Sequence, residues 1–477
     1  MADQHRADLL GCAGDASAQT PNIDRLAAEG TRFSRTSCQG PLCMPARASF
    51  LTERYVRDHG VYTNSVDVAQ GTPTYVHALR EAGYHTAQVG KAHLTDDQYE
   101  ADVHHVDDLA YRLEERGFAE VHETTDKFTG STPNAWTDAL AARGVLDAYR
   151  QYIADRNYAG EHDTGRGATK IIPMWEAIPT PVPDDLYIDA WHGDLFTRWV
   201  EDYERDQPFF VFFGFPGPHD PWDAPRVAVD RYDGVDMTMP TSTRRPDVGA
   251  AGRYGMLVAG LLHMSDTDTM TDDAIRAMRR AYSANVTIID DAVGRIVGAL
   301  ESRGFLDNTW VIYTSDHGEM GGNHGLMSKL LQYQQAVRVP LIVRPPGGAP
   351  ARVVDSLVEH VDVPATVRDI AGAPGVPQSE GRSLLGYLRG SDPAPRSVAV
   401  SETFGFASFE TDRYKIVVDE DALTPCQLFD LHEDPVEDEN LVGDPQSAGV
   451  IEELMDTHVR PFLTTPAYRP HPSPLPA

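Results

Sequence analysis

The sequence predicts an α/β protein: a large, mostly parallel sheet between layers of helices, followed by a smaller C-terminal α+β subdomain that contains an antiparallel sheet. Short apolar segments alternate with helical segments along most of the 477-residue chain, which is the pattern of a parallel sheet. Residues 209–213 are apolar at every position, as expected for a strand that is covered on both faces. The chain is longer than one typical domain of ~100–200 residues, so we expect one large unit with an appendage.

Helices are predicted from apolar residues at helical spacing and from residues that start or stop a helix. Asn22 can cap the first helix and Thr72 the second, because a side-chain oxygen satisfies the free N–H groups of a first turn. Gly304 ends a long amphipathic helix. The predicted helices cover residues 21–30, 73–81, 195–203 and 271–303.

Four strands are predicted, at residues 85–89, 208–213, 309–314 and 340–343. In open α/β sheets, ligands bind at the carboxyl ends of the strands. Polar side chains follow three of these strands, and a single such residue is more often a helix cap or an ordinary loop residue. Several independent strands that end in polar residues are the pattern of a site. These residues are Lys91 and His93, then His219, then Asp316 and His317.

Composition divides the chain further. Residues 373–395 are rich in Gly, Pro and Ser and mark a boundary. Beyond it, residues 406–409 and 414–418 flank a hairpin turn. The acidic and irregular insertion is interpreted as the rim of the sheet, where substrate choice usually resides, and the Pro-rich end as a tail. The predicted divisions are an α/β unit at 1–385 with the rim insertion at 100–190, an antiparallel subdomain at 386–465 and a tail at 466–477.

Charge and cysteine content exclude several classes of protein. The chain has 72 acidic and 41 basic residues, with a formal net charge of −31. This argues against binding to nucleic acid or to an anionic membrane, since both need basic patches. Four cysteines do not form a disulfide framework for a chain of this size. The first residues are polar and no apolar run approaches the ~20 residues that span a bilayer, so we expect a cytoplasmic protein.

The most specific motif begins at Cys43. It opens a Cys-x-Pro-x-Arg string that ends at Arg47, and a Leu-Thr-x-Arg string follows at residues 51–54. A free cysteine before a proline is usually an inert buried residue. Together with the polar residues at the strand ends, the motif favours a functional role for Cys43.

Taken together, these segments resemble the sulfatases, the formylglycine-dependent family of the alkaline phosphatase superfamily with a Cys-x-Pro-x-Arg signature. The resemblance implies an alkaline phosphatase-like fold and hydrolysis of a sulfate monoester. It also implies that a formylglycine-generating enzyme oxidises Cys43 to formylglycine (3-oxoalanine). The segments that carry the resemblance are residues 3–8, 20–26, 43–54, 90–93, 218–221, 314–320, 325–329, 338–342, 412–415 and 428–431.

The resemblance also implies a site for one divalent metal ion. Asp3, Asp316 and His317 correspond to its ligands, Gln4 adjoins them, and formylglycine at Cys43 completes the set. Oxygen-rich ligation suits hard cations such as Ca²⁺ or Mg²⁺. The imidazole shifts the expectation toward Mn²⁺ or a softer ion. Ca²⁺ is the first choice, with Mn²⁺ and Mg²⁺ left open.

Cationic side chains are expected to hold the sulfate group. By resemblance, Arg47, Lys91 and Lys329 neutralise its oxygens together with the metal ion. Ordinary surface roles are the alternative for the two lysines. The expected substrate-binding residues are Asn64, Lys91, His219 and Lys329.

The implied reaction has two stages. The hydrated aldehyde at residue 43 attacks sulfur, and His219 protonates the departing alcohol, with Lys329 as a second candidate. His93 then takes a proton from the remaining hydroxyl and sulfate is released. Histidine suits both steps because its pKa lies near neutrality.

Two departures from the family pattern stand out. Glu53 takes the place of a glycine in the Leu-Thr-x-Arg string. Relatives carry an apolar strand just before the aspartate that corresponds to Asp3, and here only Met1 and Ala2 precede it. If that strand is absent, Asp3 is expected to lie on a frayed terminus.

Two other functions remain open. The first is a phosphonate monoester or phosphodiester hydrolase of the same superfamily, which also fits Asp316 and His317; the Lys91-Ala92-His93 segment favours sulfate esters. The second is a catalytically inactive binding paralogue. For the enzyme, we expect a small anionic sulfate ester as substrate, and an assembly of identical subunits is compatible with the sequence.

Overall fold

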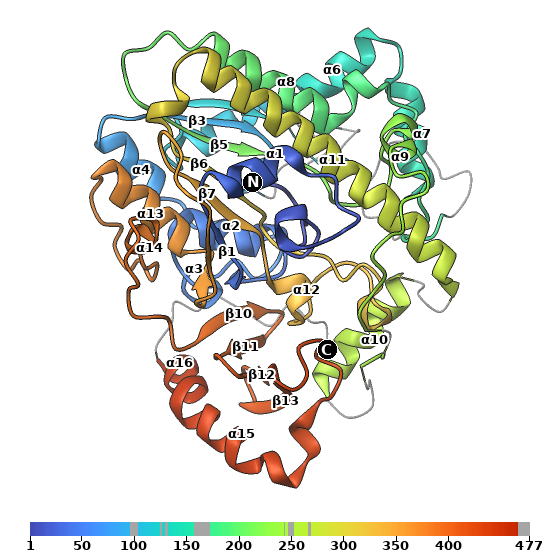
Figure 1. The fold of residues 1–477 in the computed structure, drawn as a ribbon, viewed down its shortest axis with the longest axis vertical. Helices are drawn as coiled ribbons and strands as arrows, with labels where there is room; N and C mark the ends of the chain where they lie inside the picture. The colour runs from blue at the N-terminus through green and yellow to red at the C-terminus, as the bar shows by residue number, and fades with distance from the viewer. Residues whose placement is uncertain are drawn as a thin grey trace.

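The computed structural model describes residues 1–95, 104–124, 126–128, 132–156, 172–242, 244–246, 252–265 and 269–465. The predicted tail and part of the rim insertion lie outside these residues. Two β-sheets lie in the upper part of the molecule and an antiparallel sheet lies below them (Figure 1). The predicted α/β class is confirmed.

The first sheet is wholly parallel. Its order is β4 (Glu120–Glu123), β3 (His85–Gly90) and β5 (Phe209–Gly214). β3 lies in the middle of this sheet and every one of its residues is buried, including the polar side chains of His85, Thr86 and Gln88. The strands predicted at 85–89 and 208–213 are confirmed.

The second sheet is mixed. Its order is β6 (Val311–Thr314), β7 (Leu341–Arg344), β1 (Thr31–Phe33) and β8 (Arg352–Val354). β7 runs antiparallel to both of its neighbours, whereas β1 and β8 are parallel. The predicted strands at 309–314 and 340–343 are therefore present, in a sheet with two antiparallel pairings. A small parallel pair, β2 (Thr36–Ser37) with β9 (Val358–Glu359), adjoins it.

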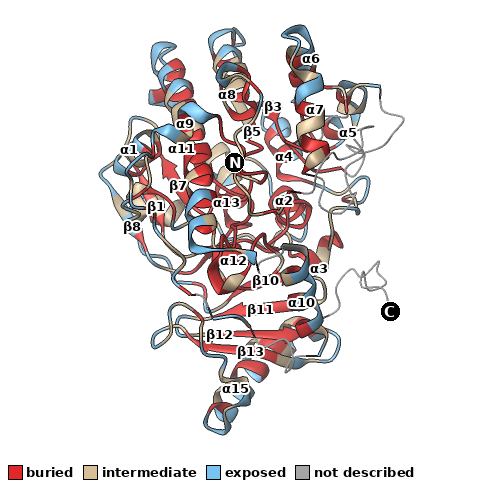
Figure 2. Ribbon diagram, turned by 90° about the vertical axis from the view of Figure 1, so that its right-hand side faces the viewer, coloured by how far each residue is buried: buried red, intermediate tan, exposed pale blue. Residues whose placement is uncertain are grey.

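The first residues of the chain join the two sheets. The Met1 ammonium donates to the carbonyl of Phe213 at 2.7 Å, at the end of β5. The Ala2 N–H donates to the carbonyl of Thr314 at 2.8 Å, at the end of β6. The N-terminus accordingly lies inside the fold (Figures 1 and 2). The expected frayed terminus is wrong: Asp3 is fully buried, because these backbone bonds hold the segment from both sides.

One face of the sheets is covered by α1 (Pro21–Ala28), α8 (Ile188–Glu201) and α11 (Asp272–Ser302), whose apolar residues form one core with β5, β6 and β7. Thr271 caps α11 through the N–H of Ala274, and this start agrees with the predicted helix. The predicted cap of α1 is wrong. Asn22 lies inside that helix and donates its side-chain N–H to Asp290 of α11 at 2.8 Å.

The opposite face is covered by α2 (Cys43–Thr52), α4 (Tyr75–Glu81) and α13 (Asp362–Ala371), which share a second core. Thr74, rather than the predicted Thr72, caps α4. All ten residues of α2 are buried. Figure 2 shows this helix in red at the centre of the molecule. The Cys-x-Pro-x-Arg motif therefore lies on a helix with no solvent face.

The C-terminal sheet is antiparallel, with the order β10 (Ala399–Thr403), β11 (Phe406–Glu410), β12 (Tyr414–Asp419) and β13 (Thr424–Asp430). The hairpin expected around residues 410–413 is the β11–β12 connection. α10 (Arg253–Ser265) packs on one face, and α15 (Ala448–Leu454), a π-helical turn (Met455–Val459) and α16 (Arg460–Thr464) pack on the other. The exact domain limits stay a prediction.

Shorter helices complete the described structure. Helices α6 (Ala135–Ala142) and α7 (Leu146–Asp155) build a small core with α8 inside the rim insertion. No helix in the described part of the chain is both long and apolar enough to cross a bilayer. The short helices are α3 (Val56–His59), α5 (Ala110–Glu114), α6 (Ala135–Ala142), α7 (Leu146–Asp155), α9 (Arg226–Asp230), α12 (Gln334–Val337) and α14 (Leu385–Leu388).

Candidate active site

The polar residues predicted at three strand ends do meet, and Cys43 lies among them at the first turn of α2. One ligand atom from each of Asp3, Cys43, Asp316 and His317 lies within 4.8 Å of the others, and all four residues are buried. The Cys43 Sγ is 3.2 Å from His317 Nε2 and 3.8 Å from an oxygen of Asp3. Two carboxylates, an imidazole and the cysteine therefore form one cluster.

The ring of His317 is oriented for ligation. Its Nδ1 lies 2.9 Å from the carbonyl oxygen of Gly318, and since a carbonyl only accepts, Nδ1 carries the proton. The lone pair of Nε2 then faces the cluster, 3.8 Å from an oxygen of Asp3 and 3.8 Å from one of Asp316. A backbone bond that fixes the tautomer in this way is typical of histidine metal ligands.

Arg47 holds the two carboxylates in place. Its Nε donates to Asp316 at 2.8 Å and its Nη2 to Asp3 at 3.1 Å. Its Nη1 donates to the carbonyls of Lys91 and Ala92. Four of its five N–H groups are thus engaged by the protein. The predicted residue is in the site, and its contacts favour a role in building the cluster and balancing its charge.

Lys91 is completely buried. Its Nζ lies 2.7 Å from Asp3 and 3.2 Å from Asp126. Burial alone would lower the pKa of Lys91, but the two carboxylates outweigh it and raise the pKa. The ammonium is therefore a permanent positive charge beside the cluster, which agrees with its predicted place.

His219 and Lys329 form a second cationic group. The Lys329 Nζ donates to His219 Nε2 at 2.7 Å, and His219 Nδ1 lies 2.7 Å from the carbonyl oxygen of Asp220. The ring therefore carries its proton on Nδ1 and accepts at Nε2. Burial, and then the Lys329 charge, lower the pKa of His219. The proton between the two side chains accordingly rests on Lys329.

The Gln4 side chain faces this pair. Its Oε1 accepts from Lys329 at 2.5 Å, and its Nε2 donates to Glu319 in a short hydrogen bond. The backbone N–H of Gln4 donates to Asp316 at 3.0 Å. Its predicted role as a metal ligand stays a prediction, and both ends of its amide are already in hydrogen bonds.

His93 and Asn64 lie at the edge of the cluster. Burial, and then the charge of Lys91, lower the pKa of His93 to about 3, so its ring is neutral near pH 7. The Asn64 Oδ1 accepts from the N–H of Met44 at 3.0 Å, next to Cys43. Asn64 thus supports the first turn of α2, and its contact with substrate stays a prediction.

Cys43 is almost completely buried. Burial, and then the nearby Asp3 carboxylate, raise the pKa of its thiol to about 12. The cysteine as encoded is therefore protonated at neutral pH, and a thiol is a much weaker nucleophile than a thiolate.

Three residues of the site were not predicted. Asp126 comes from the rim insertion and pairs with Lys91, while Phe128 of the same segment packs edge-on against the His219 ring. Glu319 lies in a motif segment, without a role assigned to it. The sequence contained a signal for Glu319, its place three residues after Asp316, and none for Asp126.

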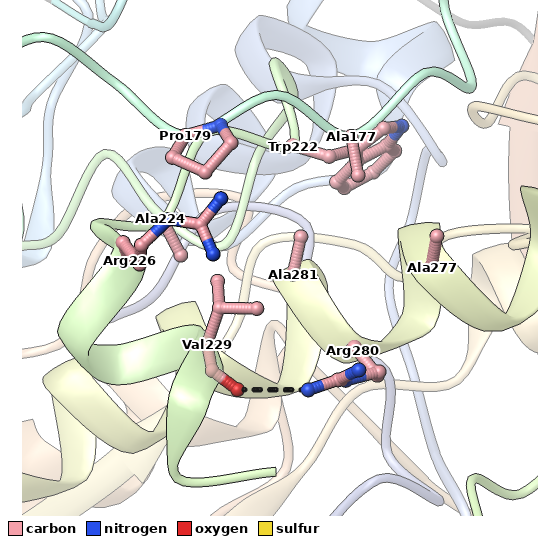
Figure 3. Close-up of a pocket in the computed structure, with 9 residues that line it drawn as sticks. All are labelled: Ala177, Pro179, Trp222, Ala224, Arg226, Val229, Ala277, Arg280 and Ala281. Carbon is pink, nitrogen blue, oxygen red and sulfur yellow. Dashed lines mark hydrogen bonds between the residues drawn. The ribbon is translucent and has the colours of Figure 1, made fainter. Parts of the chain in front are cut away.

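A separate hollow of about 190 Å³ lies between α9 and α11, next to Trp222 (Figure 3). None of the predicted site residues lines it. The lining residues are Ala177, Pro179, Trp222, Ala224, Arg226, Val229, Ala277, Arg280 and Ala281.

The cluster fits a divalent cation. Asp3 and Asp316 are completely buried, and Arg47 and Lys91 bind only one oxygen of Asp3 and Arg47 only one of Asp316. The other oxygen of each carboxylate faces His317 Nε2. Two carboxylates, one imidazole lone pair and the side chain of residue 43 provide O- and N-donors of the kinds that Ca²⁺, Mn²⁺ and Mg²⁺ accept.

The fold and the cluster define a class: proteins with the alkaline phosphatase-like α/β fold and a site at the carboxyl ends of the strands. Within that class, the chain belongs to the Sulfatase family, whose model matches residues 1–373. A model described as N-sulphoglucosamine sulphohydrolase, C-terminal, matches residues 322–460. The protein is therefore an enzyme of the sulfatase family, and the inactive alternative is not supported.

Relatives with established names are similar over nearly the whole chain. The choline-sulfatase of Rhizobium meliloti (strain 1021) is 29% identical, over 94% of this chain and 82% of its own. The arylsulfatase of Clostridium perfringens (strain 13 / Type A) is 27% identical, over 93% of this chain and 89% of its own. Among solved structures, the phosphonate monoester hydrolase of Silicibacter pomeroyi superposes with a TM-score of 0.79 and 26% identity, covering 98% of this chain and 95% of its own.

Proposed function

We propose that this protein hydrolyses a small sulfate monoester, with formylglycine at residue 43 and one divalent cation. The observation that carries the proposal is the position of Cys43. It lies in a buried cluster with Asp3, Asp316 and His317, beside the ammonium group of Lys91. The family match and the sulfatase names of two relatives support the same reaction.

The cation would be held by Asp3, Asp316, His317 and residue 43, with Gln4 as a further candidate. When bound, it supplies a positive charge that polarises a sulfate oxygen and lowers the pKa of a hydroxyl group next to it. Ca²⁺ remains our first choice, ahead of Mn²⁺ and Mg²⁺. Oxidation of Cys43 by a formylglycine-generating enzyme would supply that hydroxyl group in place of the protonated thiol.

The chain's own cations hold the anionic end of the substrate. Lys91 and Lys329 bring two ammonium groups to the site, and both pKa values are raised despite burial, because carboxylates and Cys43 lie nearby. Fixed charges in a dry site stabilise developing negative charge far better than the same charges in water. The strongly acidic protein thus keeps a local cationic pocket for an anionic ester.

Proton transfer is assigned to two places. The Lys329–His219 pair gives a proton to the departing alcohol oxygen, and the hydrogen bond from Lys329 to His219 Nε2 supports Lys329 as its source. His93, whose ring is neutral near pH 7, is assigned as the acceptor of the proton that must leave before sulfate is released.

Two measurements test this proposal. The protein is co-expressed with a formylglycine-generating enzyme, and the intact mass of the tryptic peptide that contains residue 43 is measured. Conversion of the thiol to the aldehyde lowers that mass by about 18 Da. The converted enzyme should hydrolyse 4-nitrophenyl sulfate, and Cys43→Ala should not. Full turnover by Cys43→Ala would contradict the proposal.

A second candidate is a phosphonate monoester hydrolase, which is favoured by the fit to the Silicibacter pomeroyi structure. Parallel rates on 4-nitrophenyl sulfate and on a phenyl phosphonate ester separate the two. Sulfate esters are expected to react faster, since the Lys91-Ala92-His93 segment resembles the sulfatase pattern. A faster reaction of the phosphonate ester would reverse the assignment.

A further inference from the structure

Three consecutive residues of the rim insertion are directed toward the site. Asp126 pairs with Lys91, whereas Lys127 and Phe128 contact the loop that carries His219 and the ring of His219 itself. The side chain of Lys127 is almost completely buried, and lysines are very rarely buried without partners. The partners of Lys127 therefore show what this part of the insertion is attached to.

Lys127 binds one acceptor in the His219 loop and one on α11. Its Nζ donates to Asn285 Oδ1 at 2.6 Å and to Asp223 Oδ1 at 3.2 Å. The hydroxyl group of Tyr187 lies near the same two oxygens, 2.8 Å from that of Asp223 and 3.1 Å from that of Asn285. Asp223 comes four residues after His219 in the chain. One ammonium group thus fixes the far end of the loop.

The same network reaches the near end of the loop. The NH₂ group of Asn285 donates to Asp189 Oδ2 at 2.8 Å, and Asp189 Oδ1 accepts the backbone N–H of Gly217 at 2.7 Å. A Cβ atom at Gly217 would lie 2.3 Å from Asp189 Oδ2, so the network packs directly against the backbone there. Gly217 is two residues before His219. The loop at 217–223 is therefore held at both ends.

The orientation of the Asn285 amide follows from its two partners. A carboxylate only accepts hydrogen bonds, so the NH₂ group must face Asp189, and an ammonium only donates, so the C=O group must face Lys127. Lys127 also supplies positive charge beside Asp189 and Asp223, which are both buried. Burial raises the pKa of Asp189, and the Lys127 charge opposes that rise. Loss of this ammonium would affect every bond of the network.

Phe128 contacts the His219 ring from the side of the rim insertion. The two rings meet edge to face, with centroids 6.0 Å apart and an angle of 83° between their planes. Phe128 belongs to the small core that α6, α7 and α8 build inside the insertion, so its own position is set by that core. The ring of His219 is restrained at a second point, where Nδ1 lies 2.7 Å from the carbonyl oxygen of Asp220.

We infer that Lys127 and Phe128 are positioning residues for His219: Lys127 fixes both ends of its loop, and Phe128 restrains its ring. The inference rests on the proposed function and deepens it, because it assigns part of the rim insertion to proton delivery. In the step this serves, the S–O bond to the alcohol breaks and its electron pair stays on the alcohol oxygen. That oxygen takes a proton from the Lys329–His219 pair, which regains one from solvent.

The inference predicts a dependence on the leaving group. An alkyl alkoxide is a strong base and needs the proton as the bond breaks, whereas 4-nitrophenolate leaves without much help. A residue that positions the proton-donating pair therefore matters for an alkyl sulfate and little for 4-nitrophenyl sulfate. A residue that only supports the fold lowers the rates on both substrates by the same factor.

The first test compares Lys127→Met and Phe128→Leu with wild type on hexyl sulfate and 4-nitrophenyl sulfate. We expect kcat on the alkyl sulfate to fall about 10- to 100-fold, and on the aryl sulfate by less than about 3-fold, since only part of the effect of a positioned acid is lost. Equal losses on the two substrates, or no loss, would overturn the inference.

Each variant has a matched control. Lys415→Met removes another buried ammonium group, which pairs with Glu437 in the C-terminal region. Ile153→Val alters the same small core as Phe128→Leu. Both controls should leave the ratio of the two rates unchanged. If Lys127→Met does not fold, it is combined with Asp223→Asn, which removes one buried negative charge together with the positive one.

The second test asks whether the two residues act through His219. Phe128→Leu and Lys127→Met are each combined with His219→Ala and assayed on phenyl sulfate, whose phenolate is a stronger base than 4-nitrophenolate. Residues that act through His219 should lower kcat little further once the imidazole is gone, whereas independent effects multiply. Losses that multiply would overturn the inference.

Bound metal and the mass of the residue-43 peptide are measured on each variant. Both should match wild type, because Lys127 and Phe128 contact the His219 loop and its ring. Loss of metal or of the oxidised residue in the two variants would assign their effect to the cation site and would overturn the inference.

The proposed function can fail separately. If wild type is inactive on these sulfates but cleaves phosphonate esters, sulfate hydrolysis is wrong. The same variants are then compared on alkyl and aryl phosphonate esters, where the selective loss is again expected. If wild type cleaves none of these esters, both the function and the inference are rejected.

Discussion

The carboxylate of Glu53 is completely buried against the guanidinium of Arg368, with hydrogen bonds of 2.5 Å to Nε and 2.7 Å to Nη2. Glu53 ends α2 with a φ of 58°, in the left-handed region that favours glycine. The ion pair thus keeps a residue other than glycine in this conformation and ties α2, the helix that begins at Cys43, to α13. Glu53, which takes the place of the glycine in the family signature, therefore has an ion-pair partner in Arg368.

Removing only Arg368 from the Glu53–Arg368 pair should destabilise the protein more than removing both residues. Arg368→Leu leaves a buried carboxylate without its counter-charge, so we expect a loss of about 3–5 kcal/mol in the free energy of unfolding. Glu53→Gly relieves the left-handed backbone and should cost less. The double variant should be more stable than Arg368→Leu alone. Urea denaturation measures all three, and strictly additive losses would contradict the pairing.

Removing the metal ion should destabilise the protein. Dialysis against a chelator leaves Asp3 and Asp316 without the cation, and adding Ca²⁺ or Mn²⁺ at about 100 times its Kd should restore about 2.7 kcal/mol. Thermal unfolding with and without added metal measures the shift. His317→Ala should abolish it, and His432→Ala, an exposed histidine, should not. A full metal-dependent shift in His317→Ala would contradict the assigned ligand.

Asp126 should affect catalysis more than stability. Its carboxylate is one of two that fix Lys91, and it comes from the rim insertion. Asp126→Asn keeps the shape but removes the charge, so Lys91 moves toward Asp3 and away from the substrate. We expect kcat/KM on 4-nitrophenyl sulfate to fall about 10-fold, because one close charge pair is worth roughly 1–2 kcal/mol. Asp107→Asn, at an exposed position of the insertion, is the control.

Glu380 should make stability depend on pH. Burial, and then the charge of Asp58, raise its pKa from 4.5 to about 8. Between these values the folded state holds a proton that the unfolded state has lost, so this group's stabilising effect is present at low pH and is lost as the pH rises through 8. Glu380→Gln should therefore gain Tm relative to wild type as the pH rises from about 5 to about 9. An equal difference at every pH would contradict this.

The helices and strand ends were accessible from the sequence because they depend on local pattern. The long helix at 271–303 appears as α11, and Asp316 follows β6 as expected. Parallel strands bring their carboxyl ends to one edge, so Lys91, His219 and Asp316 could be grouped before their positions were known. The direction of β7, which runs antiparallel to both neighbours, could not be predicted from the local sequence.

Partners that are distant in sequence account for the remaining differences. Asn22 was predicted as a cap from its own neighbourhood, yet its side chain bonds to Asp290, 268 residues away. Gln4 meets Glu319 and Lys329 across more than 300 residues. Nothing in the local pattern of these residues distinguishes them from ordinary polar positions. Their roles follow only from which donors and acceptors the fold brings together.

The buried N-terminus has a practical consequence for anyone who purifies this enzyme. The Met1 nitrogen is bonded to the carbonyl of Phe213, between β5 and β6. Residues in front of Met1, whether native or part of an affinity tag, would lie between β5 and β6, two positions from a proposed metal ligand. An activity assay should therefore compare proteins that differ only in the residues placed there.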